Sequence, residues 1–262
     1  MKNTVLITGA TGGIGRELAK QFASAGDDLI LVGRNEEKLQ KLMKELLSFS
    51  KSQIEYFICD FRKESHGKEL YEMVKQRNKV IDILVNAAGF GLYNSFLDEK
   101  INLQEELIEV NLVAMLNLCY FFGRDMQKRK KGYIINFASI SGFFPGPFMA
   151  TYYASKAFVL SFSLGLYKEL KKDNIQVLAI CPGVIDTPFY RKANAMKNQS
   201  FLLERMPPES PERFAKKAYR LILKRKEGYK VISIKNKILI FLSHFVPRKI
   251  LSNIIAWIQA KK

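Results

Sequence analysis

The amino-acid sequence predicts an α/β fold: a doubly wound parallel β-sheet with helices on both of its faces. Short apolar runs alternate six times with longer stretches of helical periodicity, which is the pattern of successive right-handed βαβ units. The runs are rich in Val, Ile and Leu, as expected for strands buried on both faces. With 262 residues, 48% of them hydrophobic, the chain can bury one large core as a single domain.

The expected elements follow one another in strict alternation. Strands are predicted at 4–8, 28–32, 54–59, 81–86, 133–138 and 175–180, and helices at 13–26, 35–50, 64–78, 102–129 and 150–172. After Pro182 the alternation stops and a polar stretch follows. Ser210, Pro211 and Glu212 have the residue types of an N-cap, a first helical position and a first turn. A helix is therefore expected from there to about 226, followed by a weak strand at 229–234.

Composition argues against several classes of protein. The N-terminus lacks the apolar run of a signal peptide, and no stretch of about 18 uninterrupted apolar residues occurs, so neither export nor a membrane-spanning helix is expected. Cys59, Cys119 and Cys181 lie far apart without metal-type spacing. We interpret them as ordinary thiols of a reducing compartment and predict a cytoplasmic protein. With only His66 and His244 available, no metal site is expected.

Positive charge is concentrated in the last quarter of the chain. The net charge is +17, and residues 188–262 carry 18 Lys and Arg against four Asp and Glu, whereas residues 1–187 carry 24 against 21. Such a basic segment favours an anionic partner or surface. No nucleic-acid-binding motif accompanies the charge, so nucleic acid is not expected as a partner.

A glycine-rich sequence, TGATGGIG at 8–15, lies between the first expected strand and the first expected helix. Glycines there let the backbone approach a pyrophosphate closely, and the helix N-terminus adds N–H groups and a positive dipole. We therefore expect a Rossmann-like dinucleotide site. The alternative is a tight turn that needs glycine only for a positive φ.

The second strand ends in Gly33 and Arg34, where a dinucleotide fold usually offers an acid to the adenine ribose. The next acids, Glu36 and Glu37, fall inside the following helix. Arg34, helped by Lys38, can instead pair with a 2′-phosphate. We expect NADP(H) rather than NAD(H); the alternative is that Arg34 is a solvated loop cation.

Four further motifs follow the glycine-rich turn in order: NAG at 86–89 as Asn-Ala-Ala-Gly, a serine at 139, YxxxK at 152–156 and PGxxxT at 182–187. With TGxxxGxG at 8–15, this series resembles the short-chain dehydrogenase/reductase family in its single-domain members. The resemblance covers residues 4–188. It implies a cofactor site formed by Thr8, Gly9, Gly13, Ile14, Gly15, Arg34, Asp60, Asn86, Ala87, Gly89, Tyr152, Lys156, Pro182, Gly183 and Thr187.

The resemblance also implies the interconversion of a carbonyl and an alcohol, in which hydride transfer needs a proton for the developing alkoxide. It assigns that proton to Tyr152, the substrate oxygen to Ser139, and a proton-relaying water to Asn111. Lys156 would hold the nicotinamide ribose. Because Tyr152 and Lys156 lie on one helix face, and a cation about 4 Å away contributes about 4 kcal/mol at a dielectric near 20, we expect Lys156 to lower the pKa of Tyr152.

Tyr153 is also a helical neighbour of Lys156, at i to i+3, so helix spacing alone does not choose between the two tyrosines. The family register, Tyr-x-x-x-Lys, selects Tyr152, and the interval of 13 residues from Ser139 agrees with it. We interpret Tyr153 as a packing residue.

Two loops at the carboxyl ends of the expected strands are strongly apolar. They contain Phe90, Leu92, Tyr93 and Phe96, and Phe143, Phe144, Pro145, Pro147, Phe148 and Met149. Since open α/β sheets bind ligands at this edge, we predict an apolar pocket for a hydrophobic substrate such as a 3-oxoacyl chain or a sterol-like ketone. The alternative is that some of these side chains pack beneath a lid.

The stretch 188–210 takes the place of the family's substrate lid. Its cations can attract an anionic headgroup or a coenzyme A phosphate, or they can be solvated loop charges; they are Arg191, Lys192, Lys197 and Arg205.

After a catalytic domain at 1–235, residues 236–262 are predicted to form a basic and apolar helical tail. Its apolar runs, 238–246 and 250–260, are separated by Pro247 and are each too short to span a bilayer. In the second run Trp257 lies at the edge of one helical face of an interfacial type, made of Ile250, Leu251, Ile254, Ile255 and Ile258. Either the tail makes a peripheral contact with the inner face of a membrane, or it covers the substrate pocket or a partner subunit's helix.

The sequence thus predicts an NADP(H)-dependent carbonyl reductase or alcohol dehydrogenase. By resemblance we expect a homodimer or homotetramer built through the helices that contain Asn111 and Tyr152. The alternative is a noncatalytic NADP-binding sensor on the same scaffold. The complete set of Asn111, Ser139, Tyr152 and Lys156 argues against a sensor, which needs no tyrosine–lysine acid.

Overall fold

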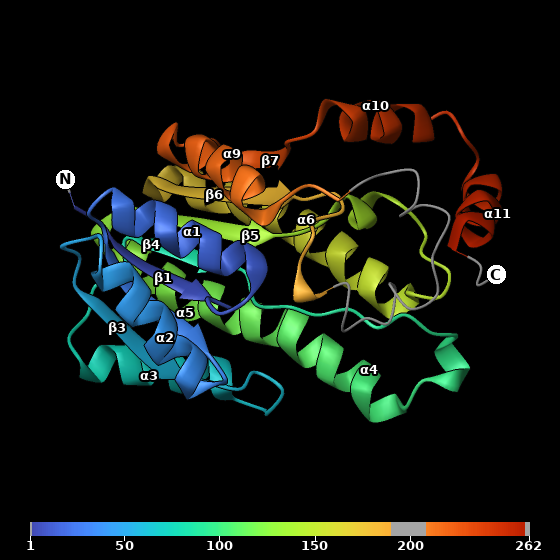
Figure 1. Cartoon of the computed structure of the whole chain (residues 1–262). Coiled ribbons are helices and arrows are strands. Elements are labelled where there is room, and N and C mark those ends of the chain that lie inside the picture. The colour runs from blue at the N-terminus through green and yellow to red at the C-terminus, as the bar shows by residue number, and fades with distance from the viewer. Residues whose placement is uncertain (1, 190–207, 260–262) are drawn as a thin grey trace.

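A computed structural model describes residues 2–189 and 208–259 (Figure 1). Its seven strands form one sheet in the order β3-β2-β1-β4-β5-β6-β7, and every neighbouring pair is parallel. The strands are β1 Thr4–Thr8, β2 Asp28–Gly33, β3 Ile54–Ile58, β4 Ile83–Asn86, β5 Gly132–Phe137, β6 Ile175–Cys181 and β7 Gly228–Val231. The strand order reverses direction between β1 and β4, so the predicted doubly wound fold is confirmed.

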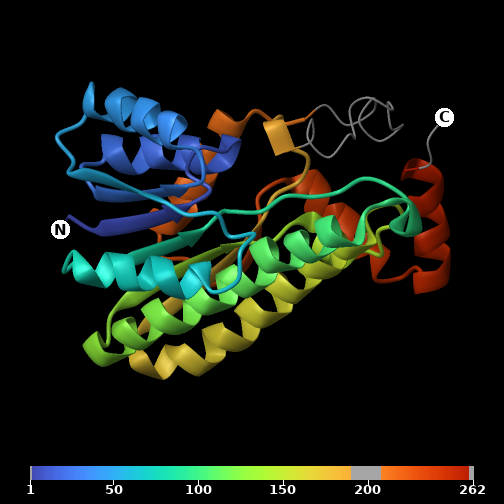
Figure 2. The same ribbon diagram turned by 90° about the horizontal axis from the view of Figure 1, so that it is seen from below.

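Helices cover both faces of the sheet, as the views in Figures 1 and 2 show. One face carries α1 Gly13–Ser24, α2 Glu36–Leu47 and α9 Pro211–Leu223; the other carries α3 His66–Gln76, α4 Ile101–Ile108, α5 Ala114–Arg129 and α6 Ala150–Leu170. Successive residues of a strand enter opposite cores: Val5 and Ile7 pack on the first side and Leu6 on the second. Burial on both sides explains the unbroken apolar runs.

The helix expected at 102–129 is interrupted by one π-helical segment. The segment Glu109–Val113 (η2) joins α4 to α5. By length and composition alone, the whole stretch Ile101–Arg129 could cross a membrane, although no such helix is expected from the sequence. Leu107, Leu118 and Phe122 are buried against the rest of the protein. Packing between the sheet and neighbouring helices accounts for this composition.

The predicted boundaries shift most after residue 208. The helix α9 ends at Leu223 rather than near 226, because Arg225 adopts a left-handed conformation with φ of 48°. The seventh strand ends at Val231, since Ser233 caps the next helix by accepting a hydrogen bond from the Asn236 N–H. The shorter strand leaves residues 232 and 233 to turn the chain into the tail.

The tail forms two helices, α10 Ile234–Ser243 and α11 Arg248–Gln259, with Pro247 between them. They lie at one end of the molecule, beyond the sheet (Figures 1 and 2). The inner side of α10 contacts β7 and the 3₁₀ helix η3, Ile140–Phe143. In α11 the predicted single apolar face is divided: Leu251, Ile255 and Ile258 are half-buried, whereas Ile250 and Ile254 are exposed.

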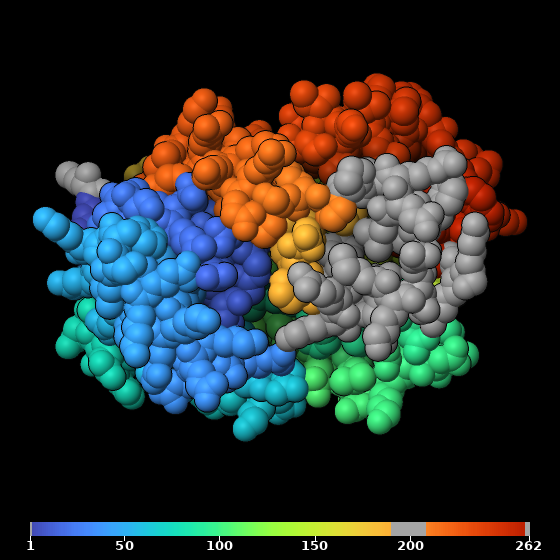
Figure 3. Space-filling view, in the orientation of Figure 1, coloured from blue at the N-terminus to red at the C-terminus, as the bar shows by residue number. Residues whose placement is uncertain are grey.

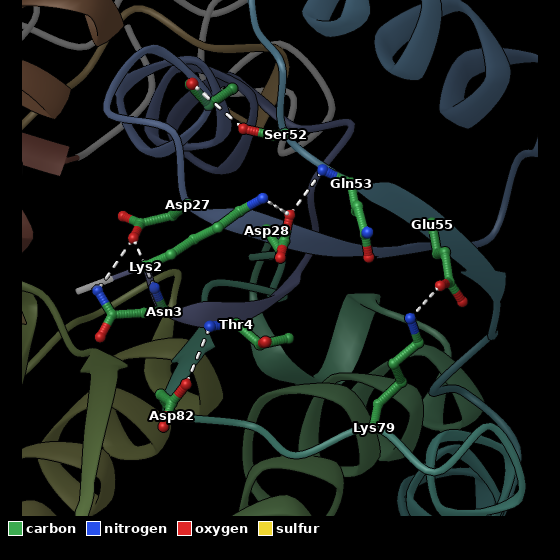
Figure 4. Close-up of polar contacts among 11 residues, drawn as sticks. Lys2, Asn3, Thr4, Asp27, Asp28, Ser52, Gln53, Glu55, Lys79 and Asp82 are labelled. Atoms are coloured by element: carbon green, nitrogen blue, oxygen red, sulfur yellow. Dashed lines mark hydrogen bonds and ion pairs between the residues drawn. The ribbon is translucent and has the colours of Figure 1, made fainter.

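Polar side chains tie the strands together near their amino ends (Figure 4). The backbone N–H of Asn3 donates to Asp27 at 2.9 Å and that of Thr4 donates to Asp82 at 3.0 Å. The Gln53 N–H donates to Asp28 at 2.6 Å. These contacts fix the strands at the edge opposite their carboxyl ends.

Candidate active site

A cavity of about 230 Å³ opens at the carboxyl ends of the strands, next to the switch point between β1 and β4. This is where open α/β sheets bind ligands. Most of the predicted site residues line it: Gly9, Gly13, Ile14, Gly15, Arg34, Ala87, Gly89, Ser139, Tyr152, Lys156, Pro182, Gly183 and Thr187.

The glycine-rich turn forms one wall of the cavity. Gly9 has φ of 63°, and a Cβ on it would lie 2.9 Å from the Ala87 carbonyl oxygen. A Cβ on Gly13 or Gly15 would collide with Thr187 or with the backbone of Gly9. Side chains are therefore excluded where a pyrophosphate needs close approach, and Gly12, which caps α1, offers no side chain to its N–H groups. These residues fit a dinucleotide.

Two predicted cofactor residues lie behind the wall rather than on it. The Thr8 hydroxyl is buried and accepts hydrogen bonds from the N–H groups of Ala87 and Ala88, both at 3.1 Å. The Asn86 amide is buried and donates to the Asn136 Oδ1 at 2.9 Å, joining β4 to β5. The Thr8 side chain therefore shapes the turn after β4, which itself lines the cavity, whereas the Asn86 side chain joins two neighbouring strands.

Arg34 and Asp60 lie at the ends of neighbouring strands but differ in their surroundings. Arg34 is exposed and lines the cavity. Asp60 is not part of the lining, and its carboxylate accepts from the Arg62 Nε at 2.9 and 3.1 Å. The Arg62 guanidinium lowers the pKa of Asp60, and the charge of Arg34 adds to this effect. The cation of this region that faces the cavity is therefore Arg34.

Helix α6 places Tyr152 and Lys156 one turn apart, both buried. The Lys156 Nζ donates to the Phe137 carbonyl at 2.9 Å and lies 5.8 Å from the centroid of the Tyr152 ring. Tyr152 lines the cavity with Ser139, whose Oγ caps η3 by accepting from the Ser141 N–H at 3.1 Å. One cation and two hydroxyl groups therefore meet in the cavity.

The expectation that Lys156 lowers the pKa of Tyr152 is not met in this structure, because burial, and not Lys156, determines that pKa. Burial raises the pKa of Tyr152 above its ordinary value, although the hydrogen bond to Ser139 acts in the opposite direction. Burial also lowers the pKa of Lys156 to about 8. The sequence-based expectation counted the attraction between the two groups but not the cost of removing each from water. Near neutral pH Tyr152 carries its proton, as a proton donor must.

Asn111 lies in the π-helical segment η2, and such segments often occur at functional sites. Its amide clamps the backbone of Phe90: Oδ1 accepts from the Phe90 N–H and Nδ2 donates to the Phe90 carbonyl, both at 3.0 Å. Nδ2 also donates to Ser155 at 3.2 Å. A Cβ on Gly89 would lie 3.1 Å from the Asn111 oxygen and 3.6 Å from the Lys156 Nζ, so Asn111 and Lys156 flank the same point.

The apolar loops divide between two places. Phe90 lines the cavity with Phe137, Pro188 and Phe189, and Tyr93 and Met149 are buried in one cluster with Tyr152. Phe148 packs against the same cluster. Phe143, Phe144 and Pro145 face elsewhere, because they line a separate cavity of about 360 Å³ under the tail, together with Gly142, Ala157, Ser243, His244, Val246, Arg248 and Leu251. The apolar lining at Phe90 is as expected, and the hydrophobic substrate stays a prediction.

Of the expected lid, the described residues include Pro188 and Phe189, whose ring centroid lies 5.3 Å from that of Tyr152. The four lid cations, Arg191, Lys192, Lys197 and Arg205, lie outside the described residues.

The tail contributes two buried residues that sequence analysis missed. The Gln259 amide donates to the Tyr153 hydroxyl at 2.6 Å, and the Tyr93 hydroxyl donates to the Gln259 carbonyl. Asn236 packs so closely on the PGxxxT turn that a Cβ on Gly183 would strike its amide. No local pattern predicts contacts between residues so distant in sequence. Tyr153, interpreted as a packing residue, is half-buried and holds the end of α11.

Comparisons with known proteins agree with this geometry. The family model for short chain dehydrogenase matches residues 3–198. The chain is 37% identical to an uncharacterised oxidoreductase of Staphylococcus saprophyticus over 183 residues, 70% of this chain and 78% of that protein. It is 32% identical to hydroxysteroid dehydrogenase-like protein 1 of Gallus gallus over 232 residues, 86% of this chain and 67% of that protein.

A similar solved structure is that of a short-chain dehydrogenase from Sphingobium yanoikuyae in complex with NADPH. It has a TM-score of 0.81 and 28% sequence identity, and the match covers 93% of this chain and 94% of that one. The family predicted from the motifs is confirmed, and with it the general class of oxidoreductase. The chain belongs to the short-chain dehydrogenase family.

Proposed function

We propose that this oxidoreductase uses NADP(H) to interconvert a carbonyl and an alcohol on a hydrophobic substrate. The observation that carries the proposal is the pair of side chains Tyr152 and Ser139, which lines one cavity with buried Lys156 and the glycine-rich turn. A bound NADP(H) supplies or accepts the hydride. The turn at residues 9–15 and Thr187 would hold it.

Each polar group in the cavity then has a distinct task. Tyr152, protonated because burial raises its pKa, donates a proton to the oxygen of a carbonyl substrate. Ser139 hydrogen-bonds the same oxygen and orients it. Lys156 holds the ribose and returns a proton to Tyr152, which its pKa of about 8 allows near neutral pH. Asn111 fixes Phe90 and the turn beside Lys156.

The preference for NADP(H) rests on Arg34, which lines the cavity, while Asp60 is paired with Arg62. The NADPH bound by the similar Sphingobium enzyme supports it. A charge-assisted hydrogen bond contributes about 1.5–3 kcal/mol, so Arg34→Ala should raise the KM for NADPH about 10- to 150-fold and leave that for NADH nearly unchanged. Lys41→Ala, at an exposed position of α2, is the control. A preference of the unaltered enzyme for NADH would contradict the assignment.

The hydrophobic substrate is inferred from the apolar part of the wall, formed by Phe90, Phe137 and Phe189. The resemblance to hydroxysteroid dehydrogenase-like protein 1 supports a lipid-like ketone. The test is NADPH oxidation with 3-oxoacyl thioesters, steroid ketones, quinones and small aldehydes. We expect the highest kcat/KM among the apolar ketones, and Ser139→Ala should reduce it. Equal rates with small polar aldehydes would contradict the substrate class.

We also propose a homo-oligomer in the cytoplasm. Tyr120 on α5 and Phe158 on α6 are exposed by 57% and 40%, which suits burial against a second copy through these helices. The three thiols are free and buried, and burial raises the pKa of each to about 12, as expected for inert cysteines. Light scattering of the purified protein should show a dimer or tetramer, and a monomer would contradict this assembly.

A further inference from the structure

The two tail helices and the turn between them expose a series of large apolar side chains to solvent. We call this series the outer tail face: Ile234, Ile238 and Phe241 on α10, Phe245 in the turn that follows it, and Ile250, Ile254 and Trp257 on α11. The residues recur at intervals of three and four, so each set occupies one side of its helix. Their exposure runs from 44% for Ile254 to 72% for Phe245. Isolated exposed apolar residues are ordinary, but a patch of this kind marks an interaction site.

The opposite sides of the same helices are fixed to the protein. Asn236 and Ile240 of α10 are buried, and Gln259 at the end of α11 is buried and hydrogen-bonded to Tyr153. The tail is therefore docked in a definite orientation. In Figure 1 the ribbon of α10 lies at the upper right and that of α11 at the right margin of the molecule, and Figure 3 shows atoms of the tail, in red, at the upper right.

Charge identifies the partner. From residue 228 to residue 262 the sequence has seven Lys and Arg and no Asp or Glu. Lys235, Lys237 and Lys249 flank the outer tail face, are exposed, and take part in none of the ion pairs of the described residues. A surface that is both apolar and cationic complements a bilayer with anionic headgroups. Each cation near such a surface contributes about 1 kcal/mol of attraction, and this attraction decays within a Debye length.

We propose that the outer tail face docks the protein on an anionic lipid bilayer, with α10 and α11 lying in the interface. The helices have 10 and 12 residues, too few to span a bilayer core. A second copy of the chain is a poorer partner, because a two-fold contact would bring the same cations against one another. The proposal is independent of the catalytic assignment, since the face contains none of the residues of the cavity.

The chain carries its own reporter, because Trp257 is its single tryptophan and lies on the outer tail face. The full-length protein is titrated with vesicles of phosphatidylcholine and phosphatidylglycerol in equal parts, and with vesicles of phosphatidylcholine alone. We expect the tryptophan emission to shift to shorter wavelength and the protein to sediment with the anionic vesicles, with binding weakened by salt. An unshifted emission and no sedimentation would overturn the proposal.

Three variants locate the contact. Phe241→Ser with Phe245→Ser should lower the vesicle partition coefficient at least about tenfold, and Lys237→Gln with Lys249→Gln should lower it about 25-fold at low salt, about fivefold per cation. Leu47→Ser with Phe49→Ser is the matched control, because these residues are similarly exposed at the far end of α2.

Both test variants retain Trp257, so each is read by fluorescence as well as by sedimentation, and circular dichroism checks that each is folded. Wild-type binding in both test variants, equal loss in the control, or equal binding to neutral vesicles would contradict lipid docking through this face. Loss of oligomerisation without vesicles would identify a second copy as the occupant instead.

Discussion

Lys156 allows the electrostatics of the site to be tested through stability, without substrate or cofactor. Burial lowers its pKa from the ordinary 10.5 to about 8, which corresponds to roughly 3 kcal/mol. Between pH 8 and pH 10.5 the unfolded chain binds more protons at this lysine than the folded protein does, so stability rises with pH across this window. Below about pH 8 the cost of burying the charge is fully present.

Replacing this lysine with methionine removes the titration. Lys156→Met also leaves the Phe137 carbonyl without its donor, at a cost of about 1–3 kcal/mol, which does not depend on pH. We therefore expect the variant to be as stable as the wild type or more so at pH 7.5, and less stable at pH 10.5. The difference in free energy of unfolding between the two proteins should change by about 3 kcal/mol across the window.

The assay is urea denaturation of the cofactor-free protein at a series of pH values. Lys168→Met is the control, because Lys168 is exposed on the same helix; its stability curve should run parallel to that of the wild type. Parallel curves for wild type and Lys156→Met would refute the reasoning, since they would mean that Lys156 keeps an ordinary pKa in the folded protein.

Two further predictions concern residues that support the site. Thr8→Val keeps the side-chain shape but removes the acceptor for two N–H groups of the turn after β4. We expect the free energy of unfolding, measured by urea denaturation, to fall by about 2–4 kcal/mol. An unchanged stability would contradict the assigned hydrogen bonds. Gln259→Leu removes the hydrogen bond to Tyr153 and should speed tryptic cleavage at Lys249 about five- to tenfold, because α11 opens locally more often. Asn253→Leu, at an exposed position of the same helix, should leave the cleavage rate unchanged. Equal cleavage rates in the two variants would contradict the docking of the tail.

Much of the fold was predictable because its signals are local. Continuous apolar runs define strands buried on both faces, and the fixed spacing of Tyr152, Lys156 and Ser139 brings them into one cavity once the parallel sheet forms. The glycine positions were predictable for the same reason: Gly9 needs a positive φ, and Gly13 has no room for a Cβ.

What could not be predicted depends on tertiary contacts. The pKa of Tyr152 rises because the folded chain surrounds it, and a sequence does not report how deeply a side chain is buried. Thr8 matches a cofactor motif, yet its hydroxyl serves a neighbouring turn. The docking of Gln259 and Asn236 joins the tail to residues that lie far away in the chain. The single apolar face expected for α11 is divided because Leu251, Ile255 and Ile258 pack on the protein while Ile250 and Ile254 do not.

The most direct test of the proposed chemistry compares the two adjacent tyrosines. NADPH oxidation is measured with the best carbonyl substrate for the wild type, Tyr152→Phe and Tyr153→Phe, with NADPH binding followed separately by fluorescence. We predict that Tyr152→Phe loses at least about 100-fold in kcat with NADPH binding retained, and that Tyr153→Phe retains most of its turnover. Full activity in Tyr152→Phe, or its loss only in Tyr153→Phe, would contradict the assignment of Tyr152 as the proton donor.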